Sequence, residues 1–327
     1  MIKVSKYSSF CFDEDNFKFD KQIKYIQPFR STLVLRECAV GIIHSSTSDV
    51  KCSVAPLGSY NSTLFELQSE LYEFEEQSDI AINIDDFLSI PNANIRTFSI
   101  SEANTLSLSP FTPYSLVVWV KNTGGSFTIA NIANFVCFDY ANDKDKSDYC
   151  GSDILELRYS CPKGSELHFL KDNEFAFFPS NPSRTVLTSF VGGFNKRENG
   201  YDTDVETFRD VNSTLHNLSG FNSQKDLLLM GDSMGVPNDM GKKLSLIMSC
   251  EKIWAWNREY DNSGNVGIGI PVVLADKSTM ERMRLKDNYP FYVFSCSVER
   301  RDTRLYNQIT KLPTYGAYNN DYNDDYN

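Results

Sequence analysis

The residues with the clearest chemical potential follow an apolar run in the second half of the chain. Leu227–Met230 leads into Gly231-Asp232-Ser233, and a serine placed just after an apolar strand is a candidate nucleophile. Its hydroxyl needs a neighbouring base, because an unactivated serine is a poor nucleophile. The histidines of the chain all precede this motif: His44, His168 and His216. We therefore favour the alternative interpretation, a strand that ends in a tight turn.

A second candidate is the acidic loop Ala141–Asp153, in which oxygen-bearing side chains alternate as a hard cation prefers. An EF-hand loop that begins at Asp143 needs glycine at its sixth position and glutamate at its twelfth. This chain has Asp148 and Ile154 there, so the EF-hand pattern is excluded. A looser calcium site in this loop stays open beside a simple solvated loop.

Cysteine chemistry is the third possibility. The eight cysteines are Cys11, Cys38, Cys52, Cys137, Cys150, Cys161, Cys250 and Cys296. No two have the spacing of a zinc knuckle, so we predict no metal and no cofactor. Most lie in apolar runs, where a free thiol behaves as a small buried hydrophobe. Cys150 and Cys161 could face each other across a hairpin, but a reducing compartment is the better expectation.

Two tryptophans stand at alternate positions of an apolar run, Trp254 and Trp256. Alternate residues of a strand face the same side, so the pair suits a platform on which a sugar stacks. The same pattern is more typical of a sandwich core or a subunit contact. We predict that both residues contribute to such contacts.

Composition narrows the classes of partner. The chain has 327 residues, with 32 Lys and Arg against 43 Asp and Glu, a net charge of −11. A sequence-independent grip on phosphates needs a cationic surface, so we predict no direct nucleic-acid partner. The start, Met1–Phe19, lacks the apolar stretch of a signal peptide, and no run approaches the length of a membrane-spanning helix. The sequence thus predicts a chain that is made in the cytoplasm and carries no signal peptide or transmembrane segment.

Short runs rich in Val, Ile, Thr, Phe and Tyr dominate the chain and are bounded by turn residues. About fifteen such runs predict strands, among them Tyr114–Lys121, Ile154–Ser160 and Lys243–Trp256. Helices are expected at Thr63–Gln77, with a pair of strands as the alternative, and more briefly at Val205–Leu218 and from Ser278 to Lys286. The predicted fold class is mainly β: antiparallel β-sandwiches or jelly rolls, two in number, with a few short helices.

Polar stretches suggest how the chain is divided. We expect an N-terminal sandwich over residues 1–191, a polar connection over 192–225, and a C-terminal sandwich over 226–312. Residues 313–327 form a flexible or arm-like tail of low complexity. Its tyrosines are predicted to contact neighbouring subunits: Tyr315, Tyr318, Tyr322 and Tyr326.

Two family resemblances bear on function. Gly231-Asp232-Ser233 resembles the nucleophile block of the GDS-type esterases, but that family's downstream Asp-x-x-His is absent here. In length, strand rhythm and composition the whole chain resembles the double jelly-roll capsid proteins of tailless icosahedral viruses and phages. That resemblance implies a homotrimeric capsomer whose sandwich flanks and terminal arms contact other copies.

The sequence therefore predicts a virion structural protein and not an enzyme: a capsid protein, located in the virion, that self-assembles through its β-sandwich flanks and terminal arms. Its expected partners are other copies of itself, most simply in a homotrimer, and further virion proteins, with contact to an internal membrane left open. The alternatives are another virion component, such as a spike, fibre, minor capsid or connector protein, a carbohydrate- or receptor-binding module, and a β-sandwich hydrolase.

Overall fold

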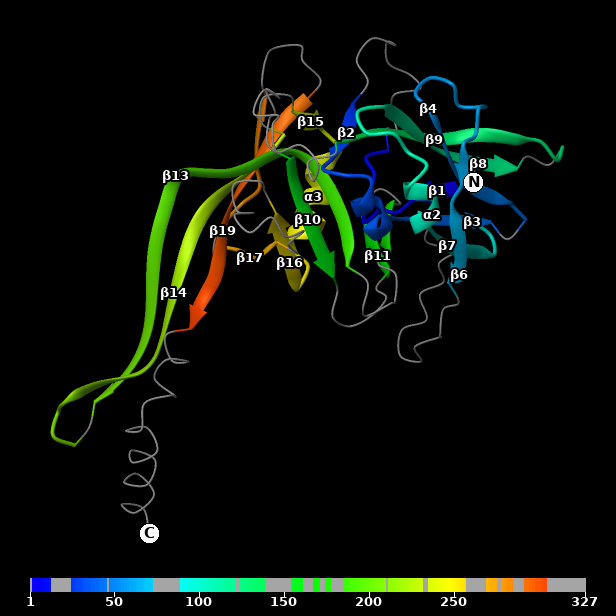
Figure 1. Ribbon diagram of the computed structural model, residues 1–327. Coiled ribbons are helices and arrows are strands. Elements are labelled where there is room, and N and C mark those ends of the chain that lie inside the picture. The colour runs from blue at the N-terminus through cyan, green and yellow to red at the C-terminus, as the bar shows by residue number, and fades with distance from the viewer. Residues whose placement is uncertain are drawn as a thin grey trace.

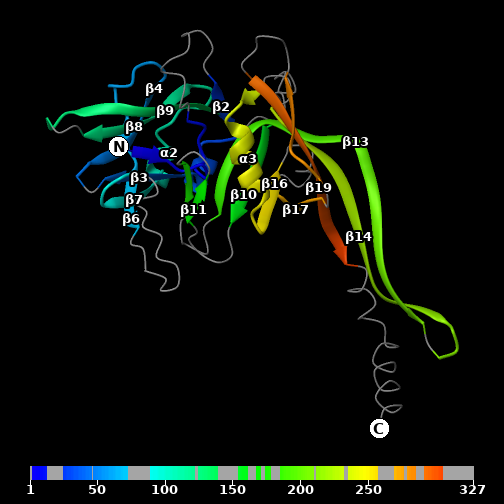
Figure 2. The same cartoon turned by 180° about the vertical axis from the view of Figure 1, so that it is seen from behind.

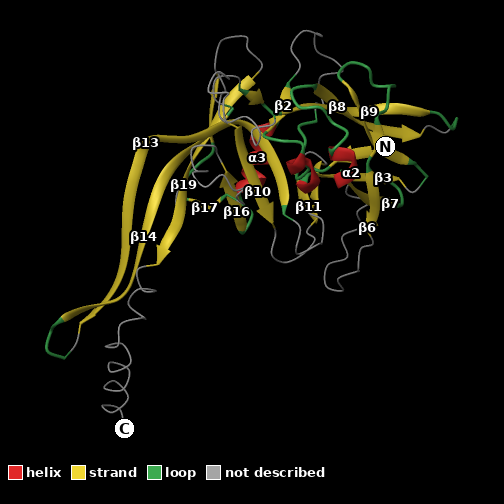
Figure 3. Cartoon of the chain, viewed as in Figure 1, coloured by secondary structure: helices red, strands yellow, loops and turns green. Residues whose placement is uncertain are grey.

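The computed structural model describes the chain in fourteen stretches. They are residues 2–12, 25–45, 47–72, 89–121, 124–138, 154–160, 167–170, 174–177, 185–209, 211–231, 235–256, 269–275, 278–284 and 291–304. Strands dominate these stretches, with two short α-helices and one 3-10 helix (Figure 3). The prediction of a mainly β chain built from antiparallel strands is confirmed.

Two sheets form the N-terminal part. The first runs in the order β1 (Ile2–Val4), β3 (Ala39–Ser45), β7 (Ala93–Ser99) and β6 (Gln68–Tyr72). The second runs in the order β2 (Ile26–Phe29), β9 (Phe127–Cys137), β8 (Pro113–Lys121), β4 (Val50–Pro56) and β5 (Phe65–Glu66). Inward residues of both sheets, such as Ile42 and Phe135, belong to one core. All ladders here are antiparallel except that of β2 and β9. The 3-10 helix η1 (Leu33–Glu37) and α2 (Glu102–Thr105) connect strands of this part.

The second part of the fold is a closed six-stranded barrel. Its strands follow one another around the ring as β14 (Leu215–Met230), β13 (Val186–Arg209), β10 (Ile154–Ser160), β16 (Lys252–Trp256), β17 (Ile270–Leu274) and β19 (Phe291–Arg304). The pairing of β19 with β14 closes the ring. Two short strands, β15 (Val236–Pro237) and β18 (Glu281–Arg284), add to β19 outside it. The strands β11 (Leu167–Leu170) and β12 (Glu174–Phe177) form a separate two-stranded sheet, and Phe175 of β12 packs with Ile43 and Ile95 of the N-terminal part.

Alternation along the barrel strands explains its interior. On β10, Leu155, Leu157 and Tyr159 belong to the barrel core, while Glu156 and Arg158 at the positions between them do not. The helix α3 (Met240–Met248) packs into the same core, because Met240, Leu244, Ile247 and Met248 recur along one of its faces. Figures 1 and 2 show the barrel and the N-terminal sheets side by side.

A long hairpin leaves the barrel and projects away from the body of the molecule (Figures 1 and 2). We call it the arm and define it as Gly200–Arg209 of β13 with Leu215–Lys225 of β14. The ladder is shifted between Asn195 and Gly200, where β13 carries extra residues. Just before this corner, a Cβ on Gly192 would collide with the carbonyl oxygen of Leu229, so the close approach of the two strands requires glycine.

Several predicted elements are wrong. Thr63–Gln77 is not a helix in its described part: residues 65–66 and 68–72 are strands, and Leu64 and Leu71 are exposed where a helical apolar face would bury them. A helix was expected over Val205–Leu218, but the described residues of this range form the end of the arm. The helix expected from Ser278 is replaced at Glu281–Arg284 by β18. The strand expected over Lys243–Trp256 is helix α3 followed by β16.

The expected division of the chain also changes. Residues 192–225, predicted to be a polar connection, are mostly paired strand. The second sandwich expected over 226–312 is not found, because its strands close a barrel with β10 and β13 from the first part. The N-terminal sheets keep a two-layer arrangement, although the jelly-roll order is not shown.

Candidate functional site

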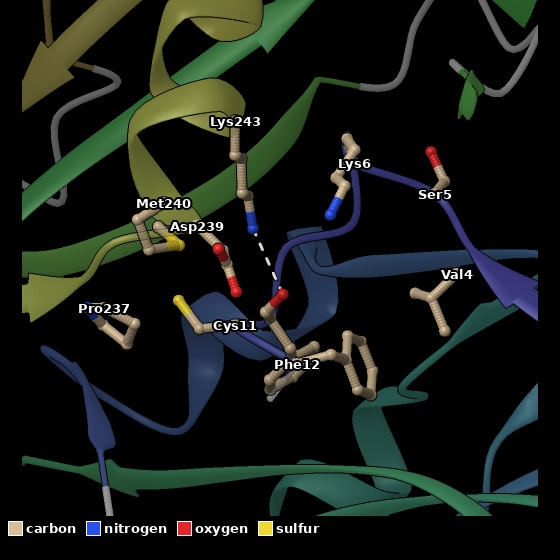
Figure 4. A pocket seen from close by; sticks show the side chains of 10 residues that line it. Val4, Ser5, Lys6, Cys11, Phe12, Pro237, Asp239, Met240 and Lys243 are labelled. Carbon is tan, nitrogen blue, oxygen red and sulfur yellow. Dashed lines mark hydrogen bonds between the residues drawn. The ribbon is translucent and has the colours of Figure 1, made fainter. Parts of the chain in front are cut away.

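A small cavity lies where the N-terminal segment meets α3 (Figure 4). Its volume is about 40 Å³. The lining residues come from two separate stretches: Val4, Ser5, Lys6, Phe10, Cys11 and Phe12 from the start, and Pro237, Asp239, Met240 and Lys243 from the α3 region. A cavity of this size has room for a few water molecules, whereas sites for organic ligands measure some hundreds of Å³.

Lys243 is the most unusual side chain of this cavity. It is 5% exposed because it stands beside the apolar stripe of α3, and its Nζ donates a hydrogen bond to the carbonyl oxygen of Phe10 over 3.2 Å. Burial lowers the pKa of this amine to about 8; the Cys11 thiol opposes the shift and Lys6 adds to it. Since the cavity is too small for an organic substrate, we interpret Lys243 as a structural residue. Its hydrogen bond to Phe10 holds α3 against the N-terminal segment.

Lys243→Met is expected to stabilise the chain by about 2 kcal/mol at pH 7. The lowered pKa represents about 3 kcal/mol of unfavourable burial, and the lost hydrogen bond to Phe10 removes about 1 kcal/mol of stabilisation. The unfolded amine binds a proton more tightly than the folded one. The wild-type protein therefore gains stability as the pH rises from 8 towards 10.5, and the advantage of the variant disappears there.

Urea unfolding of both proteins at pH 7 and pH 10 checks this. Lys242→Met is the matched control, since Lys242 is the exposed neighbour on the same helix. An advantage of Lys243→Met that is equal at both pH values contradicts the expectation.

The N-terminal segment, Ser5–Phe12, runs between the sheets and the barrel and is bonded to both. Ser9 donates its backbone N–H to Ala39 of β3, and the Tyr159 hydroxyl of β10 donates to the carbonyl of Tyr7 over 2.7 Å. Gln27 of β2 completes the junction and has no exposed surface. Its amide nitrogen donates to the carbonyl of Ser9 at 3.0 Å and that of Ser189 at 2.9 Å, and its oxygen accepts from the N–H of Cys11 at 2.9 Å.

A buried ionic cluster lies at the same junction. Arg30, at the end of β2, has its Nε 3.0 Å from Glu156 Oε2, and its guanidinium lies 4.1 Å from the centroid of the Trp256 ring. Arg158 meets the carboxylate of Glu37 through Nε at 2.6 Å and Nη2 at 3.2 Å. Its Nη1 lies 3.5 Å from Glu156. These contacts join β2 and η1 of the sheets to β10 and β16 of the barrel.

The serine motif, for which we favoured a strand ending in a tight turn, is only partly described. Residues 232–234, which include Ser233, lie outside the described residues. β14 ends at Met230, and Gly231 and Gly235 have φ values of +107° and +72° on either side of this gap. A side chain at Gly231 would also approach the carbonyl oxygen of Tyr292 to 2.8 Å. His44 lies on β3 in the other part of the fold, where its Nδ1 is 2.8 Å from the carbonyl oxygen of Ser45 and burial lowers its pKa.

The two tryptophans differ in their surroundings. Trp256 is 6% exposed and covered by Arg30 of the same chain, so its ring is not a surface for a sugar or for a second subunit. Trp254 is partly exposed at the position of β16 paired with Arg158. Of the two predicted contact residues, Trp254 alone has exposed surface.

Other predicted sites fall outside the described residues. They are the calcium loop over 141–153, the pair Cys150 and Cys161, and the tail tyrosines Tyr315, Tyr318, Tyr322 and Tyr326. Within the described stretches, no group of three His, Cys, Asp or Glu side chains is placed to hold a metal ion. Cys38, Cys52, Cys137 and Cys296 are free, buried thiols there, as the apolar runs predicted.

The feature that sequence reasoning missed is the arm. At its tip Val211 is fully exposed, and Asn212, Ser213 and Thr214 beside it are exposed as well. Single exposed apolar residues are common on protein surfaces, so the distinguishing feature is the projection of the hairpin rather than Val211 itself. The polar composition of 192–225 concealed these strands, because the sequence there shows no apolar alternation from which a strand could be predicted.

Comparisons with known proteins add no relative: no family model, no curated protein and no solved structure matches the chain. Among the described helices, none has the length and apolar character that a membrane crossing requires.

Proposed function

We propose that this chain is a structural subunit of a virus particle and that it assembles with copies of itself through the arm. One observation carries the proposal: a hairpin about ten residues long per strand extends from the barrel, and its tip makes Val211 fully exposed. An isolated two-stranded hairpin is at best marginally stable in water, so an arm of this kind suits a neighbour that covers it.

The buried contacts between the N-terminal sheets and the barrel support a role of the arm in assembly, because they hold together the body from which it projects. Gln27 and the Arg30–Glu156–Arg158–Glu37 cluster tie the sheets to the barrel through buried hydrogen bonds and ion pairs. The arm continues two barrel strands, β13 and β14, so it is fixed to this body rather than joined by a linker.

The virion setting is the part of the proposal that rests on the resemblance in length, strand rhythm and composition to capsid proteins. Because the C-terminal strands form a barrel, the proposal does not require the double jelly roll. The chain has one two-layer pair of sheets, joined to a barrel that carries the arm. This architecture favours a ring-forming or connector protein of the virion over a double-sandwich protein of the capsid shell.

Deleting the arm tests the proposal. Tyr201 and Gln224 are paired across the arm, so an Asn-Gly turn can replace residues 202–223 and close the hairpin there. We expect the full chain to form a defined oligomer by light scattering after size exclusion, and the shortened chain to show the mass of one copy. The mass of one full-length copy is 37.2 kDa.

Circular dichroism and the unfolding midpoint establish that the shortened chain is folded. Val211→Asp gives a milder test, since it changes the tip alone and is expected to weaken assembly by tenfold or more. A full-length chain that stays monomeric at all concentrations, or a shortened chain that assembles as well as the full one, contradicts the proposal.

A further inference from the structure

One edge of the arm is open along its whole length. β13 pairs with β10 through residues 186–191 only, and from Gly192 to Arg209 its ladder with β14 occupies one side. Among the strands that the structure describes, none pairs with the other side. An open edge presents a row of backbone N–H and C=O groups that can bond to a further strand.

A second open edge lies on the opposite side of the same sheet. β19 pairs with β14 as far as Arg304, but its ladder with β17 reaches no further than Arg300. Within the described strands, Thr303 and Arg304 therefore pair with β14 alone, and Arg301 and Asp302 lie at the irregularity of that ladder. The arm and the end of β19 thus form a small sheet in the order β13, β14, β19, with a different open strand at each side.

The two open strands carry opposite charge. In β13 the segment 201–206 holds Asp202, Asp204 and Glu206 at alternate positions and no basic residue. The end of β19 holds Arg300, Arg301 and Arg304 against a single acid, Asp302. Pairing β13 with β13 of a second copy would bring acid to acid, which is unfavourable, whereas pairing β13 with β19 brings acid to base.

The register places these charges at the same height along the arm. Phe221 of β14 pairs with Asp204 on one side and with Arg304 on the other. When identical copies stand side by side around an axis that follows the arm, Asp204 of one copy comes level with Arg304 of the next. Since β13 and β19 are both antiparallel to β14, the strands that meet run parallel to each other.

We propose that the outer edge of β13, Gly200–Glu206, binds the outer edge of β19, Arg301–Arg304, of a second copy by strand addition. The contact is head to tail, and such a contact closes into a ring where the rotation between copies closes; the ring we propose joins the arms and the ends of β19 into one continuous sheet. This inference rests on the proposed function and specifies its partner, its surface and its symmetry.

Charge reversal in the full-length chain tests the pairing. Variant A carries Asp202→Lys, Asp204→Lys and Glu206→Lys; variant B carries Arg301→Glu and Arg304→Glu. Each variant alone is expected to lose the oligomer under conditions in which the wild-type chain is fully assembled. A chain that carries all five substitutions restores opposite charges and is expected to regain the wild-type mass by light scattering and native mass spectrometry.

A matched control separates this effect from net charge. Glu70→Lys, Glu102→Lys and Glu251→Lys make the same change in total charge as variant A at exposed positions outside the arm, and are expected to leave assembly unchanged. Oligomers formed by variants A and B as readily as by the wild type overturn the strand pairing. A one-to-one complex of the five-substitution chain with the wild-type chain overturns the head-to-tail arrangement in favour of a symmetric β13 contact, because both mixed β13–β19 contacts would then join like charges.

The arm deletion distinguishes a failure of the proposed strand pairing from a failure of the proposed function. If variants A and B assemble while the chain without residues 202–223 does not, the proposed function stands and this pairing is wrong. If the shortened chain assembles too, both are wrong.

Discussion

Gln27→Leu is expected to lower the free energy of unfolding by about 3 kcal/mol. The substitution keeps the side-chain volume roughly constant and removes the amide that bonds to Ser9, Ser189 and Cys11. The N–H of Cys11 and the carbonyl of Ser189 lose this partner inside the junction, and each buried group left without one costs about 1–3 kcal/mol. The carbonyl of Ser9 keeps its hydrogen bond from the Thr188 hydroxyl at 2.8 Å.

Chemical denaturation at constant pH measures this change. Gln68→Leu is the control: Gln68 is an exposed residue of β6, and its substitution is expected to change stability by less than about 0.5 kcal/mol. A loss below about 1 kcal/mol for Gln27→Leu would show that water or repacking satisfies the junction without the amide.

Arg158→Met is expected to cost about 4 kcal/mol at pH 8. Arg158 is 3% exposed, and its removal leaves the carboxylate of Glu156 with Arg30 as its remaining ion-pair partner and takes both hydrogen bonds from Glu37. Breaking a buried ion pair on one side typically costs about 3–5 kcal/mol, because a charge stays in the interior. Arg36→Met is the control, since Arg36 pairs with Glu102 on the surface and such pairs contribute at most about 1 kcal/mol.

The pH dependence identifies the charge responsible. Burial raises the pKa of Glu156 to about 7, against the lowering by Arg30 and Arg158. The folded chain therefore binds this proton more tightly than the unfolded one, and that contribution is complete below pH 4.5 and lost as the pH rises through 7. Removing Arg158 raises this pKa further, so the loss of stability is expected to be larger at pH 8 than at pH 5. An equal loss at both pH values assigns the effect to packing.

Strand positions were predictable where a short run of apolar residues is bounded by turn residues. Ile154–Ser160 was predicted at its observed bounds. Tyr114–Lys121 was predicted one residue short of β8, from a nearly continuous apolar run that is buried. Helix α3 was missed because the run from Lys243 to Trp256 fits alternation. The spacing of Met240, Leu244, Ile247 and Met248 indicates the buried face of a helix. Because the charged Lys243 lies within that face, the pattern was not interpreted as an apolar helical face.

Pairing between distant strands was not predictable from local pattern. Barrel closure depends on β14 meeting β19, a contact between segments more than sixty residues apart, and nothing in either segment specifies a barrel rather than a sandwich. The junction residues show the same limit. Gln27 and Arg30 are ordinary polar residues in the sequence, and only the approach of β2 to β10 and β13 gives them partners.

The closing role of β19 also orders events during synthesis. β19 (Phe291–Arg304), which completes the barrel, is translated after the five other strands of the ring. Until it is made, β14 and β17 lack the strand that lies between them. Such long-range pairing forms slowly, and the arm obtains its third strand in the same step. Before β19 is made, the chain lacks the second edge of the proposed contact. If the chain assembles as we propose, synthesis of β19 is the step that makes a subunit competent to assemble.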